Sequence, residues 1–370
     1  MAHLKKRTLL PVGIHLTPEA AHLAQFEQVG DRLELVSQAS CSFASPQDTV
    51  TRLVAADAPP GLEADEPDYT PALRFLRQEL GWNNFKGKDA VVSLPAEHVA
   101  VQHLRMPPMQ PDELAASLPY ELEDKLPFQP EEAVVRHIVA GSVTENNETK
   151  QDVLVLAVRR DVVQSRVATI TRLKLNVVGA GVEPCSMCYG YAFASQHSEP
   201  SQSGPLCLMV VYLGWQQSHV AILRGQETTL VKPVGQGLDH VTQSVATVTE
   251  SSLEEASERV AGWRDATTPD AVDEAVTTYN RCREPIGHLT DEIQSCMRYH
   301  ASLARGAQID RLCFVGPGAC DKALVRVLSA NLAVACEVGD PVGTVTGSPD
   351  RETARPEMAV AVGLSLFGAS

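Results

Sequence analysis

The sequence predicts an α/β protein of two similar lobes that enclose a central cleft. Residues 206–213 form a continuous apolar run bounded by turn residues, and two further extended runs follow before residue 238. This pattern is typical of a buried three-stranded meander. Residues 12–24 align with residues 209–221 without a gap, so that His15 falls on Tyr212 and His22 on His219. A repeat at half the chain length indicates a duplicated lobe rather than a solenoid, whose periods are far shorter. A ligand usually binds between two such lobes.

The composition argues against several classes of protein. A net charge of −15 does not suit a nucleic-acid surface, which needs clustered lysine and arginine. The basic cluster at residues 5–7 precedes a short apolar stretch interrupted by Pro11, which favours a first strand over a signal peptide. No apolar run approaches the ~20 residues of a membrane span. The nine cysteines form no framework and indicate reduced thiols in the cytoplasm. Cys185 and Cys188 are either core residues one helical turn apart or a zinc or redox pair.

The first lobe is expected to span residues 1–195, with its core in residues 1–89 and 180–195. After the first meander come a loop at 57–71 and a helix at 72–80. Strands at 90–94 and 99–104, a helix from Pro111, strands at 134–139 and 153–158 and a helix at 161–175 follow. We therefore expect residues 90–179 to form a β-α-β-β-α subdomain inserted into this lobe.

The second lobe is expected to span residues 206–370, after a linker at 196–205 that has almost nothing apolar to bury. Its core is assigned to residues 206–248 and 305–370. A strand at 312–315 ends at Gly316-Pro317-Gly318, and a helix at 322–331, a strand at 334–338 and a helix at 359–367 complete the lobe. The helical stretch between these two parts, residues 249–304, is expected to form a reduced subdomain.

An ordered set of short motifs resembles the PilM family, the cytoplasmic actin-like proteins of the type IV pilus inner-membrane platform. The cytoplasmic part of the type II secretion GspL proteins is the next nearest family. The motifs run almost from end to end, and they are Leu104-Arg105-Met106-Pro107, Glu113-Leu114, the stretches 120–128 and 155–163, Val182-Glu183-Pro184, Val234-Gly235-Gln236-Gly237, and the stretches 311–319 and 361–366.

The resemblance implies an actin-like fold, in which two RNase-H-like lobes, each with an inserted subdomain, enclose a nucleotide cleft. In the family an Asp-x-Gly motif in the first strand pair of each lobe holds Mg²⁺-bound water and phosphate. Here His15 and Tyr212 replace the two aspartates, neither of which suits a hard Mg²⁺ ion. The candidate nucleotide-binding residues that remain in this degenerate cleft are Gly13, His15, Thr17, Tyr212, Gly214, Gly235, Gly237, Gly316 and Gly318.

These departures predict a protein without catalytic residues, metal ligands or ATP turnover, because a hydrolase must position Mg²⁺ and water. Binding of Mg-ATP without turnover stays open. The alternative is an ATP-dependent switch or a kinase-like enzyme on the same fold, which the surviving glycines favour. A membrane-tethered filament protein similar to FtsA is a further alternative, although no basic amphipathic tail follows residues 364–367. His22 and His219 are expected on separate sheets, as core residues rather than a metal pair.

The resemblance also implies a partner. In the family, the N-terminal tail of a PilN-like bitopic membrane protein lies as an extended peptide between the first lobe's core and its insert. The expected location is thus cytoplasmic, at the inner membrane through this partner, with contacts to other platform proteins and pilus motor components. The groove candidates, for which the alternative is plain core packing, are Leu104, Leu114, Leu118, Leu126 and Phe128.

Overall fold

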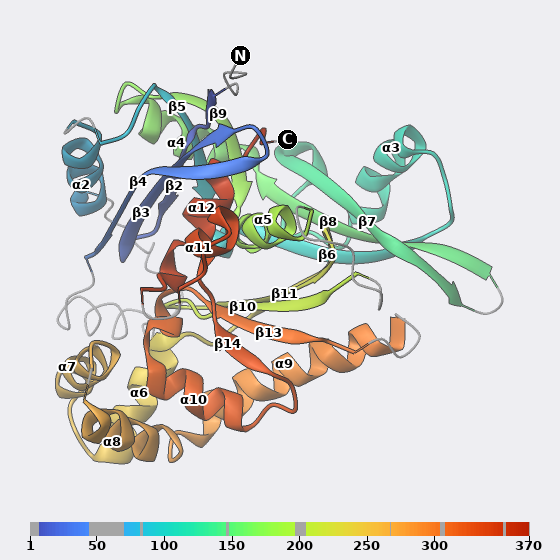
Figure 1. Ribbon diagram of the computed structural model, residues 1–370. Helices are drawn as coiled ribbons and strands as arrows, with labels where there is room; N and C mark the ends of the chain where they lie inside the picture. Colours follow the sequence, from blue (N-terminus) through green and yellow to red (C-terminus); the bar gives the residue numbers. More distant parts are fainter. Residues whose placement is uncertain are drawn as a thin grey trace.

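The computed structural model of the 370-residue chain describes residues 7–43, 70–81, 84–145, 148–196, 205–266, 268–303, 308–350 and 353–369. Residues 57–69 of the predicted loop and residues 197–204 of the predicted linker lie outside these ranges. The described residues form two large mixed sheets and one small antiparallel sheet (Figure 1).

The first large sheet has six strands. They are β1 (Arg7–Leu9), β2 (Val12–Leu16), β3 (Ala20–Val29), β4 (Arg32–Ser42), β5 (Asp89–Leu94) and β9 (Asn176–Val182). The path runs β1-β3-β2-β5-β9, with β4 on the far side of β3. β3 pairs antiparallel with β1, β2 and β4, whereas β2, β5 and β9 run parallel. Every residue of β2 is buried because helices cover both faces of the sheet, as parallel pairing requires. Helices α2 (Thr70–Gly81) and α4 (Arg160–Thr171) cover one of these faces.

The second large sheet repeats this arrangement, which confirms the duplication. Its order is β12-β11-β10-β13-β14, the counterpart of β4-β3-β2-β5-β9. The strands are β10 (Cys207–Tyr212), β11 (Ser218–Arg224), β12 (Glu227–Val234), β13 (Arg311–Val315) and β14 (Cys336–Val338). As predicted, β10, β11 and β12 form an antiparallel meander, and β13 and β14 add to β10 in parallel.

Helices pack around the second sheet in one continuous hydrophobic core. They are α6 (Leu238–Thr249), α7 (Leu253–Arg264), α8 (Pro269–Tyr279), α9 (Arg283–Leu303) and α10 (Lys322–Ala330). Trp263 of α7, Tyr279 of α8 and Ile293 of α9 belong to the same buried cluster as Met209 and Phe314 of the sheet. The sequence pattern predicted a reduced helical subdomain at residues 249–304, and the described helices of this stretch pack into the core of the second lobe. Amphipathic spacing shows that a helix has a buried face but not what that face packs against.

The small sheet forms the inserted subdomain, which projects from the first lobe (Figure 1). Its order is β6-β8-β7, from β6 (Val99–Met106), β7 (Ala133–Glu145) and β8 (Glu148–Arg159), and α3 (Pro111–Leu122) packs on it. The predicted boundaries, 90–179, were too wide. β5 and β9 pair within the first large sheet, and α4 packs on both of them. Apolar strands in a row look alike in sequence, and only their pairing partners separate core from insert.

Two helices lie between the two large sheets, α5 (Glu183–Gln196) and α12 (Ala359–Ser365) (Figure 1). α12 packs against α5 and against β2, β3 and β5. The predicted assignment of residues 359–367 to the second lobe is thus wrong, because the end of the chain crosses back to the first sheet. The crossing is close: a Cβ on Gly13 of β2 would lie 2.0 Å from the carbonyl oxygen of Ala361. A Cβ on Gly363 would lie 1.7 Å from the carbonyl oxygen of Ser186.

None of the helices in the described part of the chain is both long and apolar enough to cross a membrane.

Candidate functional site: the cleft between the lobes

Four aromatic rings join the two lobes at the base of the cleft. In the first lobe, β2 pairs with β3 so that His15 lies opposite His22, and in the second, β10 pairs with β11 so that Tyr212 lies opposite His219. The ring centroids of His22 and His15 are 5.4 Å apart, those of His15 and Tyr212 6.2 Å, and those of Tyr212 and His219 6.1 Å. All four side chains are buried. We call this row the aromatic ladder. His22 and His219, at its two ends, lie on separate sheets, as predicted.

Burial keeps the three histidines of the aromatic ladder uncharged. It lowers the pKa of His15 to about 3, with a further contribution from the positive charge of Arg166. Burial also lowers the pKa of His22 to about 3, and the next-largest cause is the neighbouring charge of His15 when that ring is protonated. Burial lowers the pKa of His219 to about 4. His22 Nδ1 lies 2.8 Å from Ser40 Oγ.

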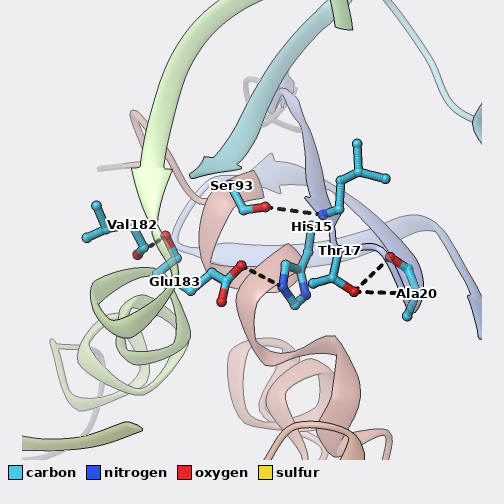
Figure 2. A network of polar contacts seen from close by, with 8 residues as sticks. His15, Thr17, Ala20, Ser93, Val182 and Glu183 are labelled. Atoms are coloured by element: carbon cyan, nitrogen blue, oxygen red, sulfur yellow. Dashed lines mark hydrogen bonds and ion pairs between the residues drawn. The ribbon is translucent and has the colours of Figure 1, made fainter. Parts of the chain in front are cut away.

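Glu183, the first residue of α5, contacts this ladder: its Oε1 lies 3.3 Å from His15 Nε2 (Figure 2). Burial raises the pKa of Glu183 to about 8, against the opposing effect of Arg166. At neutral pH the pair is therefore a neutral imidazole beside a protonated carboxyl group, and it carries no net charge.

The first candidate phosphate loop, between β2 and β3, has its polar groups bonded within the protein. The Leu16 amide donates to Ser93 Oγ at 3.1 Å, the Thr17 amide to the Ala20 carbonyl at 2.9 Å, and the Ala20 amide to Thr17 Oγ1 at 3.0 Å (Figure 2). The amides that would wrap a phosphate in an Asp-x-Gly motif thus close a tight turn instead.

The second loop, between β10 and β11, caps the N-terminus of α6. The Leu238 amide donates to the Gly214 carbonyl at 3.0 Å, and the Asp239 amide to the Trp215 carbonyl at 2.9 Å. The Gly237 amide lies 3.2 Å from His240 Nδ1. A helix N-terminus binds anions through amides that lack a partner, and these three amides have partners.

Four further candidate glycines lie in close contact with neighbouring backbone or donate hydrogen bonds to it. A Cβ on Gly214 would lie 2.3 Å from the Gln217 carbonyl oxygen, and one on Gly237 would lie 2.3 Å from the Trp215 carbonyl oxygen. Gly316 has φ of +87°, and its amide donates to the Pro356 carbonyl, while the Gly318 amide donates to the Leu213 carbonyl, both at 2.9 Å.

The structure brings together only part of the predicted nucleotide site. Thr17, Tyr212 and Gly214 line one cavity, and His15 lies in the aromatic ladder against Tyr212. Gly13 instead lies under α12, and Gly235 is exposed, with no atom within 4 Å of a Cβ built on it.

This cavity, which we call the cleft cavity, measures about 90 Å³. Sequence reasoning missed three carboxyl groups and one imidazole in its wall. Glu19 precedes β3, Glu97 lies on the 3₁₀ turn that follows β5, Glu183 begins α5, and His219 comes from β11. Burial raises the pKa of Glu97, and the charge of Glu183 raises it further. Glu183 carried a signal in the Val182-Glu183-Pro184 motif, but Glu19 and Glu97 stand in no motif. The described residues that line the cavity are Leu16, Thr17, Pro18, Glu19, Pro95, Ala96, Glu97, Glu183, Tyr212, Gly214, Trp215, Gln216, Gln217 and His219.

The five predicted groove residues fall into two groups. Leu104, Leu114 and Leu118 are buried in the core between α3 and the small sheet, where no peptide can contact them. Leu126 and Phe128 stay partly exposed. Leu104, Leu114 and Leu118 therefore agree with the alternative expectation for the groove candidates, which is plain core packing.

A different feature, a shallow and open depression of about 540 Å³, lies on α4, and every described residue that lines it belongs to this helix or its C-cap. We call it the α4 groove. The side chains that line it are Val163, Gln164, Val167, Ala168, Thr171 and Arg172.

The chain has two lobes of equal strand order, with helices that cross between them and a cleft at their repeated hairpins. This arrangement defines an actin-like protein. The comparisons agree. Three solved structures share this fold across nearly the whole chain. A PilM-PilN type IV pilus biogenesis complex matches with a TM-score of 0.71 at 20% identity, over 97% of this chain and 98% of that one. The ethanolamine utilization protein EutJ from Carboxydothermus hydrogenoformans matches with a TM-score of 0.51 at 13% identity, over 97% and 89%. A nucleotide-free diol dehydratase-reactivating factor matches with a TM-score of 0.52 at 10% identity, over 98% and 100%.

The family model described as type IV pilus assembly protein PilM matches residues 71–368, well over half of the chain. The chain belongs to this family. A search of curated proteins by sequence found no match.

Proposed function

We propose that this chain is an assembly component of a type IV pilus or type II secretion-like inner-membrane platform. Its role would be to bind the cytoplasmic N-terminal tail of a PilN-like bitopic protein. Membership in the PilM family and the likeness to a PilM-PilN complex support this proposal. The chain would then lie on the cytoplasmic side of the inner membrane, held there by its partner, and contact other platform proteins and motor components.

The observation that carries the proposal is the α4 groove. α4 directly follows the last strand of the insert and packs on β5 and β9, so the groove lies on the helix that connects the insert to the first-lobe core. Val163, Val167 and Thr171 follow one another at i+4 spacing along the groove, which gives a row of partly exposed, mostly apolar contacts.

The strand next to α4 offers main-chain hydrogen bonds. β9 ends the path of the first sheet, and it has no charged residue to protect its edge. Its Val178 is 41% exposed. An extended peptide that docks at a sheet edge gains backbone hydrogen bonds, while side-chain pockets read alternate residues. The apolar side chains of the α4 groove, on the helix that packs on β9, would supply such pockets.

Fluorescence polarisation with a labelled N-terminal peptide of the partner tests this role. The wild-type chain should bind it, and Val167→Asp should weaken binding about tenfold or more, because a charge in an apolar contact must be desolvated. The matched control is Val139→Asp, at a valine on β7 that is 44% exposed and outside the groove. Absence of binding by the folded wild-type chain at tens of micromolar, or equal loss in both variants, would refute the proposed site.

We further propose that the cleft turns over no ATP, because the residues present do not fit a magnesium triphosphate. Mg²⁺ takes oxygen ligands, and the two positions that would supply them hold His15 and Tyr212, which are buried in the aromatic ladder. Three amides of the first phosphate loop and three at the start of α6, beside the second loop, already have partners; they belong to Leu16, Thr17, Ala20, Gly237, Leu238 and Asp239. The cleft cavity of about 90 Å³ is smaller than the ~300 Å³ at which ligand pockets usually begin, and its carboxyl groups repel phosphate.

Calorimetry with Mg-ATP and Mg-ADP, together with a phosphate-release assay, tests this second proposal. We expect no saturable heat up to millimolar nucleotide and no release above the buffer rate. Micromolar binding would instead support the alternative, an ATP-dependent actin-like switch or kinase-like enzyme.

A further inference from the structure

Basic side chains gather at the edge of the first large sheet that points away from the cleft. The parallel strands β2, β5 and β9 run toward the cleft, because Pro95, which follows β5, lines the cleft cavity. The starts of β5 and β9 therefore lie at the opposite edge, at the top of Figure 1 and away from the second lobe. Residues 84–88 and 172–175 lead into these two strands. The Asn176 amide joins the two segments by donating to the Lys88 carbonyl at 2.7 Å.

This edge reverses the sign of the chain, whose net charge is −15. We call its four basic residues the basic edge, and they are Lys86, Lys88, Arg172 and Lys174. All four are exposed, and none forms an ion pair with another residue in the described part of the chain. The acid at the entry to these strands is Asp89, whose Oδ1 accepts from Asn176 Nδ2 at 2.8 Å, and it offsets one of the four charges.

The local structure explains only half of the basic edge. Arg172, the C-cap of α4, and Lys174 suit the negative end of the helix dipole. Lys86 and Lys88 lie on no helix, so a dipole does not account for them. The two lysines are therefore the residues on which a partner of opposite charge is best tested.

Two large apolar side chains are exposed beside these charges. Leu9 of β1 is 38% exposed, and a Cβ built on Gly87, between the two lysines, would lie 3.3 Å from its Cδ2 atom. Phe367, which follows α12, is 52% exposed, and its ring would lie 3.2 Å from a Cβ built on Gly179 of β9. Basic side chains next to exposed apolar ones are typical of proteins that bind at the boundary between lipid headgroups and acyl chains. An acidic protein segment or a free anion would need only the charges.

We propose that the basic edge rests on a bilayer of anionic lipids, with its cations among the headgroups and with Leu9 and Phe367 at the interface. Each lysine or arginine near an anionic leaflet strengthens binding about fivefold. The acidic second lobe does not prevent this contact, because it lies at the far end of the molecule and charges are screened over ~8 Å at physiological salt.

This inference deepens the proposed function and rests on it for the presence of the inner membrane. α4, whose groove would hold the partner's tail, ends at Arg172 of the basic edge. A tail that leaves the membrane at this edge would therefore enter the groove directly.

Co-sedimentation of the full chain with vesicles tests the inference. Vesicles of phosphatidylglycerol and phosphatidylcholine in equal parts should bind the chain, and vesicles of phosphatidylcholine alone should not. Raising the salt from about 0.1 M to about 1 M should release it, because the Debye length falls from ~10 Å to ~3 Å.

Two double variants separate local from global charge. Lys86→Gln with Lys88→Gln should weaken vesicle binding about 25-fold, at about fivefold for each charge. The matched control is Arg283→Gln with Lys322→Gln, which removes two charges from exposed positions of the second lobe and should bind as the wild type does. A thermal melt establishes that each variant is folded.

The apolar side chains have their own pair of variants. Phe367→Ser should weaken vesicle binding about threefold or more, because the part of the ring that lipid covers would return to water. Tyr120→Ser, at a tyrosine of α3 that is 81% exposed, is the control and should leave vesicle binding unchanged.

Equal binding to both kinds of vesicle, no binding to either, or the same affinity in the two double variants would overturn the inference. If the wild type ignored vesicles while Lys86→Gln with Lys88→Gln weakened binding of the partner peptide, the basic edge would bind an acidic protein segment and the inference would be wrong. The vesicles contain no partner. Loss of peptide binding with vesicle binding intact would therefore refute only the proposed function.

Discussion

Lowering the pH from 6.5 to 5.0 should destabilise the folded chain by about 3 kcal/mol through the groups of the aromatic ladder. His15, His22 and His219 have pKa values of about 3, 3 and 4 in the folded chain, whereas the ordinary pKa of a histidine is 6.5. The unfolded chain therefore binds three more protons as the pH falls below 6.5, and each one favours unfolding. Stability from these lowered pKa values is present above pH 6.5 and is lost below it.

The magnitude follows from the linkage relation, at about 1.36 kcal/mol for each unit of pH and each proton. Over this range each histidine costs about 1.7 kcal/mol, or about 5 kcal/mol for the three. Glu183 acts in the opposite direction, because its pKa is raised from 4.5 to about 8 and the folded chain holds the extra proton. Its contribution is present at low pH and is lost as the pH rises through about 8, so it returns about 2 kcal/mol between pH 6.5 and 5.0. A net loss of about 3 kcal/mol is a large part of the ~5–15 kcal/mol that stabilises a typical domain.

Urea unfolding of the wild type and of His219→Phe at both pH values measures this effect. Phenylalanine keeps an aromatic ring in the ladder, and His219 Nδ1 has no partner to lose. The loss of stability on acidification should shrink by about 1.7 kcal/mol in this variant, because one titrating group is gone. His288→Gln, at an exposed histidine, is the control and should show the wild-type loss. If His219→Phe and His288→Gln lost the same free energy between pH 6.5 and 5.0, the buried histidines would not be the cause.

Three other substitutions test the packing of the lobes. Gly13→Ala should lower the free energy of unfolding by about 3 kcal/mol, because its Cβ would overlap the Ala361 carbonyl of a backbone that cannot move aside. Gly235→Ala, where a Cβ meets open space, should stay within about 0.5 kcal/mol; equal effects in urea unfolding would show that Gly13 has no packing role. Tyr279→Phe should cost about 1–2 kcal/mol, since the tyrosine hydroxyl donates to buried Asp321 at 2.6 Å, and an unchanged unfolding midpoint would contradict this.

Patterns within single stretches of the chain were enough to predict the lobes. The run at 206–213 predicted a buried strand, and β10 is buried along its whole length. The alignment of His15 with Tyr212 predicted equivalent hairpins, and the structure places the two residues at equivalent registers in two sheets of the same order. Such predictions succeed because side-chain periodicity and turn residues act over a few neighbouring positions.

The insert and the groove required knowledge of contacts between distant segments. Residues 90–94 read as a strand, but only their parallel pairing with β2 separates them from the insert. The leucine stripe of α3 correctly indicated a buried face, and only the packing of that face on the small sheet closes it to a peptide. In α4, valines alternate with polar residues. The sequence therefore does not tell which side chains of this helix stay exposed until its packing on β5 and β9 is known.

By itself, then, the amino-acid order determined the duplicated hairpins, their turns and the loss of both aspartates from the phosphate motifs. Only the tertiary structure decided what replaced the lost site. It placed the rings of His15 and Tyr212 edge to face and bonded the amides of Leu16 and Thr17 to internal acceptors. It also gathered Glu19, Glu97 and Glu183 from three separate segments around one cavity. The physical reason is that hydrogen bonds and charges act through space at a few ångströms, whereas these residues lie up to 200 positions apart along the chain.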